Sequence, residues 1–295
     1  MIPAISIRDV GPRDGLQAEE PVDIASRVQL IDALVAAGVR TIEAVAFVSP
    51  TAVPSMAGAA EVAASVVGRQ GVTMVALVPN VRGAEMAMAA GVDALTFTVS
   101  ASAVYNERNV RMSIDASIEQ LAGVCETAGE RPVDCVVSCA FGSPYEGDIT
   151  PAAVASLCAR SRAAGATSVT LADTTGMATP RRLADVFADT GVDVGLHLHE
   201  TRGMALVNAY AGMEAGVTRF DTSVGGLGGS PFAAGAAGNL ATEDLVHLCD
   251  DLGVATGIDL AGLLDAAALV ADIVGHPVPS RIAAAGPRSR LAPPA

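Results

Sequence analysis

The sequence predicts an α/β fold of the (β/α)8 barrel class, the TIM barrel, with a short C-terminal helical appendage. Short runs of β-branched residues alternate with longer Ala-rich amphipathic segments along most of the chain. Eight such strand–helix units within roughly 250 residues are what a barrel of this class needs. A doubly wound open sheet is the alternative, but no Gly-x-Gly-x-x-Gly turn follows the first predicted strand.

Each predicted strand is short and apolar, and a predicted helix follows it. The strands are expected at 5–10, 41–47, 72–78, 94–99, 133–140, 168–172, 192–199 and 219–223. The helices are expected at 23–37, 54–68, 80–90, 113–128, from 150 onward, and at 180–189, 203–215 and 240–252. Thr150 and Pro151 form a favourable N-cap and first-turn pair, and Gly38 and Gly91 follow helix ends.

The remainder of the chain, from about residue 259, does not repeat the strand–helix pattern. It holds one more predicted helix and then a segment rich in Pro and Arg. We expect residues 1–275 to form the barrel domain with this C-terminal helix, and residues 276–295 to form a tail.

Composition and charge exclude several classes of partner. A chain of 295 residues that is 51% hydrophobic can bury a large core, and with only 3% aromatic residues that core must consist of small aliphatic side chains. The net charge of −14 argues against a nucleic-acid partner, because the phosphate backbone would repel it. Five cysteines without Cys-x-x-Cys spacing indicate reduced thiols, and no apolar run approaches the ~20 residues of a membrane span. We therefore expect a cytoplasmic protein that binds neither nucleic acid nor membrane.

The strongest chemical signal is the segment 192–200, Val-Asp-Val-Gly-Leu-His-Leu-His-Glu. Its apolar residues alternate with period 2, so His197 and His199 share the opposite face of the strand. Two imidazoles side by side can hold one metal ion, and these are two of only four histidines in the chain. A strand end whose histidines merely hydrogen-bond to their neighbours is the alternative interpretation.

Other polar residues follow the predicted strands, and in a barrel all these strand ends open on one face. They are Arg13 and Asp14 after the first strand, Asp173 at the end of the sixth, and Asn239 beyond the Gly-rich segment after the eighth. Glu43 is an acid inside the second strand, and could belong either to the site or to an ion pair inside the barrel.

The oxygen and nitrogen donors among these residues predict a metal site without thiolate. Asp14, His197, His199 and Asn239 suit a six-coordinate divalent ion with open positions, such as Mg or Mn. A three-ligand catalytic Zn site is the alternative.

Ordered motifs along nearly the whole chain resemble those of the hydroxymethylglutaryl-CoA lyase family, within the wider group of metal-dependent barrel lyases and synthases. The segment 10–17, Val-Gly-Pro-Arg-Asp-Gly-Leu-Gln, resembles the lyases, whereas related condensing synthases usually show Leu-Arg-Asp-Gly-Glu-Gln. The other matching motifs are at 47–50, 79–80, 138–140, 144–147, 197–199, 225–229 and 238–246.

The resemblance implies a retro-aldol, Claisen-type cleavage of a 3-hydroxy-3-methylacyl-CoA to acetyl-CoA and a keto acid. Hydroxymethylglutaryl-CoA, which gives acetoacetate, is the leading candidate. By this resemblance Asp14, His197, His199 and Asn239 would bind Mg or Mn, with Zn or Co as further candidates. A metal on the C3 oxygen lowers the pKa of the hydroxyl group.

The resemblance also implies roles for the remaining site residues. Arg13 would face the thioester oxygen and favour the enolate. Glu43, Asp173 and His197 would relay the hydroxyl proton, and the Gly-rich segment would close over the substrate. Family members commonly form homodimers, and we expect the same here.

Several positions depart from the family pattern. Ser230 stands where the lyases carry a Cys in Gly-Gly-Cys-Pro, and a hydroxyl is a poorer proton donor than a thiol. Ser143 also replaces a frequent Cys, and Thr51 and Ala52 replace a common Lys-Trp pair. The family resemblance therefore predicts the reaction class better than it predicts the substrate.

Three other functions remain open at this stage. They are an acyl-CoA lyase for a different 3-substituent, a condensing synthase, and a non-catalytic metal-binding paralogue. A synthase would need an added regulatory domain, which the short tail does not provide. Arg281, Arg288 and Arg290 either contact nucleotide phosphates of CoA or form a solvated basic tail.

Overall fold

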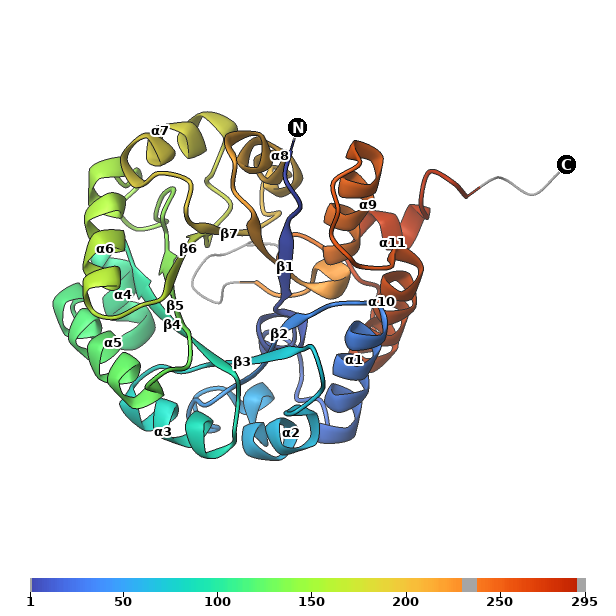
Figure 1. Ribbon diagram of the computed structural model, residues 1–295, viewed down its shortest axis with the longest axis horizontal. Helices are drawn as coiled ribbons and strands as arrows, with labels where there is room; N and C mark the ends of the chain where they lie inside the picture. The colour runs from blue at the N-terminus through green and yellow to red at the C-terminus, as the bar shows by residue number, and fades with distance from the viewer. Residues whose placement is uncertain (1, 230–237, 291–295) are drawn as a thin grey trace, which may run out of the picture.

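A computed structural model describes residues 2–229 and 238–290 of the chain. Eight parallel strands close into a barrel in chain order, and helices surround it (Figure 1). The strands are β1 (Ser6–Asp9), β2 (Thr41–Ala46), β3 (Thr73–Leu77), β4 (Ala94–Ser100), β5 (Val133–Ser138), β6 (Ser168–Asp173), β7 (Gly195–Leu198) and β8 (Arg219–Thr222). The first and last strands pair in parallel, with Arg8 opposite Asp221. The predicted (β/α)8 class is confirmed.

A helix follows each strand, as the alternation predicts. These helices are α1 (Ile24–Ala36), α2 (Ala59–Val66), α3 (Val81–Ala89), α5 (Ile114–Ala128), α6 (Pro151–Ala163), α7 (Pro180–Thr190), α8 (Ala205–Ala215) and α9 (Thr242–Leu252). Helix α10 (Leu260–Val274) is the additional helix expected after the eighth unit, and it packs beside α1. None of the helices in the described ranges is long and apolar enough to cross a bilayer.

The structure differs from the sequence expectation at four places. Helix α4 (Ala103–Val110) occupies a segment that we expected to be a loop; the Ser102 side chain caps it by accepting from Tyr105 N. The helix expected at 54–68 is split into a 3-10 turn, η2 (Pro54–Met56), and α2. The expected tail contains the short helix α11 (Arg281–Ala285), and His199 lies one residue past the end of β7.

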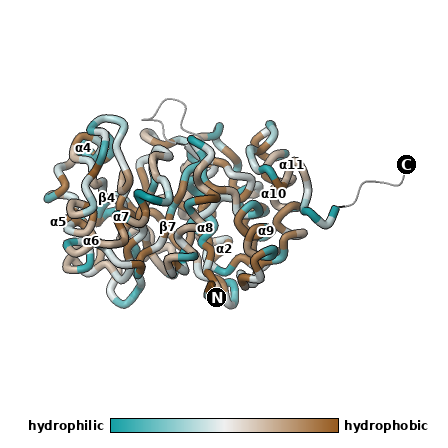
Figure 2. The backbone as a smooth tube through the Cα atoms, turned by 90° about the horizontal axis from the view of Figure 1, so that it is seen from above, coloured by the Kyte–Doolittle hydropathy of each residue, from teal (hydrophilic) through white to brown (hydrophobic). Residues whose placement is uncertain are grey.

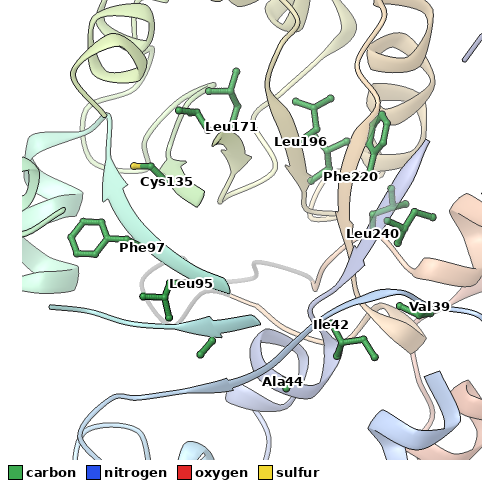
Figure 3. Close-up of a cluster of buried hydrophobic side chains, with 14 of the residues drawn as sticks. Val39, Ile42, Ala44, Leu95, Phe97, Cys135, Leu171, Leu196, Phe220 and Leu240 are labelled. Atoms are coloured by element: carbon green, nitrogen blue, oxygen red, sulfur yellow. The ribbon is translucent and has the colours of Figure 1, made fainter. Parts of the chain in front are cut away.

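The apolar core lies between the strands and the surrounding helices. Leu196 and Phe220 contribute to this layer from β7 and β8 (Figure 3). Gly212 lets α8 pack closely against it, because a Cβ there would lie 2.6 Å from Leu196 Cδ1. Hydrophobic and hydrophilic stretches alternate along the chain (Figure 2), as expected for elements with one face turned toward a core.

Replacement of Leu196 by Ala should destabilise the barrel strongly. Leu196 is fully buried, so its loss removes apolar contacts and leaves a cavity, at a cost of about 2–5 kcal/mol. Urea denaturation measures the free energy of unfolding. Val192→Ala is the matched control, because Val192 is 37% exposed and its truncation should change stability by less than about 0.5 kcal/mol. Equal effects of the two variants would contradict this account of the core.

Candidate active site

A cavity of about 700 Å³ opens at the C-terminal ends of the strands. This is the face on which barrels of this class carry their sites. Five of the predicted site residues line it: Arg13, Asp14, Glu43, His197 and His199. Gly229 lines it as well, while Ser230 lies outside the described residues.

A five-residue π-helical turn, η1 (Gly11–Gly15), presents Arg13 and Asp14 to this cavity. The carbonyl of Val10 accepts from Asp14 N at 2.7 Å and also from Arg13 N and Gly15 N, at 3.2 Å each. The Asp9 carboxylate accepts from Gly11 N at 2.8 Å and so anchors the start of the turn. Burial raises the pKa of Asp9 to about 6.

Three predicted ligands lie close enough together to hold one cation. One side-chain donor atom from each of Asp14, His197 and His199 lies within 4.8 Å of the others. The Nε2 atoms of the two imidazoles face each other at 3.0 Å, and His197 Nε2 lies 3.9 Å from Asp14 Oδ2. Asn239 Nδ2 donates to Asp14 Oδ2 at 2.7 Å, so the fourth predicted ligand contacts the same carboxylate.

The pKa shifts keep two of these groups in the form that binds a metal at neutral pH. Burial alone would raise the pKa of Asp14, but Arg13 and both histidines lower it to about 2. Burial and the neighbouring His197 lower the pKa of His199 to about 4. A carboxylate anion and a neutral imidazole are the protonation states that metal binding requires.

The site also fits a divalent cation geometrically. Ligands on adjacent corners of an octahedron around an ion with bonds of about 2.1 Å lie about 3.0 Å apart, as the two Nε2 atoms do. Asn239 Oδ1 is buried and has no hydrogen-bond partner among the described residues, so it is a free acceptor that a cation would satisfy. The donor set consists of oxygen and imidazole nitrogen, which Mg, Mn and Zn all accept.

Arg13 is held between two carboxylates. Its Nη1 donates to Asp14 Oδ1 at 2.6 Å, and its Nε and Nη2 contact Glu43 Oε2. Glu43 also accepts from the Thr96 hydroxyl, and its side chain is buried. Both interpretations of Glu43 therefore apply, because it lines the cavity and belongs to a buried ion pair.

Asp173 lies at the edge of the site and is not among the residues that line the cavity, although Ala172 and Thr174 are. Its Oδ1 accepts from Met177 N at 2.6 Å and Ala178 N at 3.0 Å, which fixes the loop after β6. Its Oδ2 is buried without a hydrogen-bond partner among the described residues. Burial raises the pKa of this carboxyl to about 6.

Two further groups of predicted residues lie away from the cavity lining. Ser143 is buried and donates to Ser102 Oγ at 2.8 Å, so it ties the loop after β5 to the start of α4. Arg281 pairs with Glu200 at 3.3 Å and Arg288 with Asp251 at 2.8 Å, and both arginine side chains are largely exposed. These pairs favour the solvated-tail interpretation.

Asp221 is the site residue that the sequence analysis missed. It lines the cavity from β8, and its Oδ2 lies 3.3 Å from His197 Nδ1. The signal was an acid inside a short strand, Arg-Phe-Asp-Thr, which is the same signal that identified Glu43.

Removal of the His199 imidazole should abolish tight binding of Mn or Mg. His199→Ala deletes a direct ligand, so the loss should exceed the roughly 10–100-fold that loss of an outer partner costs. Isothermal titration calorimetry of the metal-free protein measures the Kd. His276→Ala is the control, since His276 is exposed and pairs with Glu19 away from the cavity. Unchanged affinity in His199→Ala would rule out this ligand set.

The fold and the site together define a class: a (β/α)8 barrel with a candidate divalent-metal centre at the C-terminal ends of its strands. Comparison with known proteins then gives the family. The sequence profile of the HMGL-like family matches residues 4–270, and the chain belongs to this family.

Relatives of similar sequence and structure agree with this assignment. The chain is 41% identical, over 95% of its length and 96% of the other's, to a 3-hydroxy-3-isohexenylglutaryl-CoA/hydroxymethylglutaryl-CoA lyase of Pseudomonas aeruginosa. It is 42% identical to the hydroxymethylglutaryl-CoA lyase of Pseudomonas mevalonii, over 87% of this chain and 88% of that one. Among solved structures, an HMG-CoA lyase of Acinetobacter baumannii in complex with coenzyme A and 3-methylmalate is similar. It has a TM-score of 0.94 at 38% identity, and the match covers 99% of this chain and 98% of that one.

Proposed function

We propose that this protein is a metal-dependent carbon–carbon lyase that cleaves hydroxymethylglutaryl-CoA to acetyl-CoA and acetoacetate. The observation that carries the proposal is the juxtaposition of Arg13 with the Asp14–His197–His199 group in one cavity. The names of the relatives from P. aeruginosa and P. mevalonii support the substrate. The coenzyme A complex of the A. baumannii relative supports an acyl-CoA ligand.

The reaction needs a C3 hydroxyl that loses its proton and a thioester that accepts the electrons of the C2–C3 bond. A divalent cation held by Asp14, His197, His199 and Asn239 would supply a Lewis acid for the C3 oxygen. Arg13 supplies a fixed positive charge for the enolate oxygen of the departing thioester. Because Asp14 and Glu43 already hold the guanidinium, little reorganisation is needed when that charge develops.

Proton transfer completes the reaction. Glu43 and Asp173 are our candidates for receiving the hydroxyl proton, and the raised pKa of Asp173 suits a base that works near neutral pH. His197, the third candidate by resemblance, could accept it only at Nε2, the nitrogen that faces the candidate metal centre, so it acts as a ligand in this proposal. The enolate carbon must then be protonated. Ser230 is the candidate by its place in the Gly-rich segment, and water is the alternative donor.

Mg or Mn as the ion, a homodimer and a cytoplasmic location complete the proposal. The oxygen and nitrogen ligand set supports Mg or Mn, with Zn or Co as further candidates. All five cysteines lie in the described part of the chain and none of them is in a disulfide, which supports a reducing compartment. The homodimer rests on family resemblance alone.

A turnover assay tests the proposed reaction. Purified protein with Mn or Mg should release acetyl-CoA from hydroxymethylglutaryl-CoA, and a chelator should stop the release. Arg13→Met should lower kcat by about 10²–10³-fold, because the enolate loses its fixed cation. Metal-loaded protein that turns over no 3-hydroxyacyl-CoA thioester would refute the lyase and favour a non-catalytic paralogue.

The cavity also favours a second candidate substrate, an analogue with a 3-substituent larger than methyl. Ala52 lines the cavity where the family commonly has Trp. Several larger apolar side chains also line the cavity: Val48, Val53, Leu77, Val110 and Met112. The P. aeruginosa relative is named for an isohexenyl substrate as well as the methyl one.

Substitution of Ala52 by Trp should narrow this specificity. The wild type should cleave both hydroxymethylglutaryl-CoA and its 3-isohexenyl analogue. Ala52→Trp should lose activity on the analogue selectively, because the indole takes up cavity space that the larger substituent needs. The ratio of the two kcat/KM values measures the change. Thr51→Lys is the matched control, since Thr51 does not line the cavity. Equal ratios in wild type and Ala52→Trp would exclude Ala52 as the determinant.

A further inference from the structure

A buried ion cluster occupies the barrel interior below the candidate metal centre. Leu196 and Phe220 pack on the helix side, with Gly212 of α8 against both (Figure 3). Strand alternation therefore turns the next residues, His197 and Asp221, into the barrel. Asp221 on β8 is in register with Arg8 on β1 and with His197 on β7. The three side chains therefore lie at one level of the barrel, where β8 pairs with β1 to close it.

Arg8 donates two hydrogen bonds to the carboxylate of Asp221. Its Nε donates to Oδ1 at 2.8 Å and its Nη2 to Oδ2 at 2.6 Å. Nη2 also donates to Asp134 Oδ2 at 2.9 Å, and Ser168 and Thr170 donate to the two oxygens of Asp134. Barrel interiors of this class are usually filled with branched apolar side chains, and buried charges are costly. A cluster of charges in this layer therefore requires a functional explanation.

Asp221, at one end of this cluster, contacts the imidazole of His197 in the candidate metal centre. Asp221 Oδ2 lies 3.3 Å from His197 Nδ1. By contrast, His199 Nδ1 is buried and has no hydrogen-bond partner among the described residues. The two histidines thus differ at Nδ1, since only His197 has a carboxylate next to that nitrogen.

We propose that Asp221, fixed by Arg8, is a positioning residue that sets the tautomer and ring orientation of His197. As an anion with no proton to donate, Asp221 can only accept, so it selects the tautomer with hydrogen on Nδ1. The lone pair of Nε2 then points toward His199 and Asp14, where a cation would bind. Carboxylates behind metal-binding imidazoles have this effect in proteins generally.

The charge state of Asp221 is consistent with this role. The Arg8 guanidinium donates one hydrogen bond to each oxygen of Asp221, and this paired geometry is that of an arginine with a carboxylate anion. Arg8 itself does not line the cavity, and its side chain donates to Asp221 and Asp134.

Asparagine cannot replace Asp221 without a conflict. Arg8 donates to both carboxylate oxygens, so either orientation of an amide would place its NH₂ against a donor of Arg8. If the NH₂ took the place of Oδ2, it would also donate to His197 Nδ1. The hydrogen would then move to Nε2, and His197 would no longer have a lone pair for the metal.

The first test is the tautomer of His197 in the metal-free wild-type protein. Long-range ¹H–¹⁵N correlation spectra, recorded well above the pKa of the imidazole, should show a protonated Nδ1 and an unprotonated Nε2. With only four histidines in the chain, the signals can be assigned by single His substitutions. A hydrogen on Nε2 would overturn the proposal, and this measurement does not depend on whether any Asp221 variant folds.

The second test compares two carboxylates of the same cluster. Asp221→Asn should weaken Mn or Mg binding by about 10–100-fold and, where the amide NH₂ takes the place of Oδ2, shift His197 toward the other tautomer. Asp134→Asn should keep the metal affinity within about threefold of wild type and leave the His197 tautomer unchanged, because the Arg8–Asp221 pair and its contact with His197 remain. Thermal unfolding of both variants measures how much stability is lost when one carboxylate of the cluster is removed.

The outcomes separate this inference from the proposed reaction. Equal losses of affinity in the two variants, or a hydrogen on His197 Nε2 in the wild type, would refute the role of Asp221 whatever the enzyme cleaves. Because the readouts are metal affinity and a spectroscopic signature, they hold even if hydroxymethylglutaryl-CoA is not the substrate.

Discussion

The paired hydrogen bonds between Arg8 and Asp221 join the first strand of the barrel to the last, and the organisation of the site depends on them. On the outer side of these strands, generic aliphatic packing holds the helices. On the inner side, the charged pair lies beside His197, at the same level of the barrel, and links barrel closure to the orientation of a candidate ligand. The same contact therefore serves architecture and chemistry.

Above this level, each element of the site is held by a buried polar group of its own. Asp9 holds the π-helical turn with Arg13 and Asp14, and Glu243 accepts from Gly225 N at the start of the Gly-rich segment. Both carboxyls are buried, and burial raises the pKa of Glu243 to about 7. Fixed loops explain how short strands can present side chains from distant parts of the sequence to one cavity.

Sequence alone predicted the barrel and most of the candidate metal centre, because both depend on periodicity. Alternation in strands sets which face His197 takes, and in a barrel the strand order follows the chain. Helix α4 was missed because it is only eight residues long and has an uninterrupted polar run, 106–109, at its centre. Asp221 was missed because an isolated acid in a four-residue strand does not reveal its partners. Those partners come from β1 and β7, and only the closed barrel brings them together.

The hydrogen bond between Asn239 and Asp14 spans 225 positions of the sequence. Asp14 belongs to the first strand–helix unit, the histidines to the seventh, and Asn239 to the eighth, between β8 and α9. No partial barrel contains this set of residues, so a cation would recognise only the finished fold. Its binding free energy would then stabilise the native state alone, by about 2.7 kcal/mol at a metal concentration 100 times the Kd. The supply of metal in the cell would thereby help to determine how much of the protein is folded.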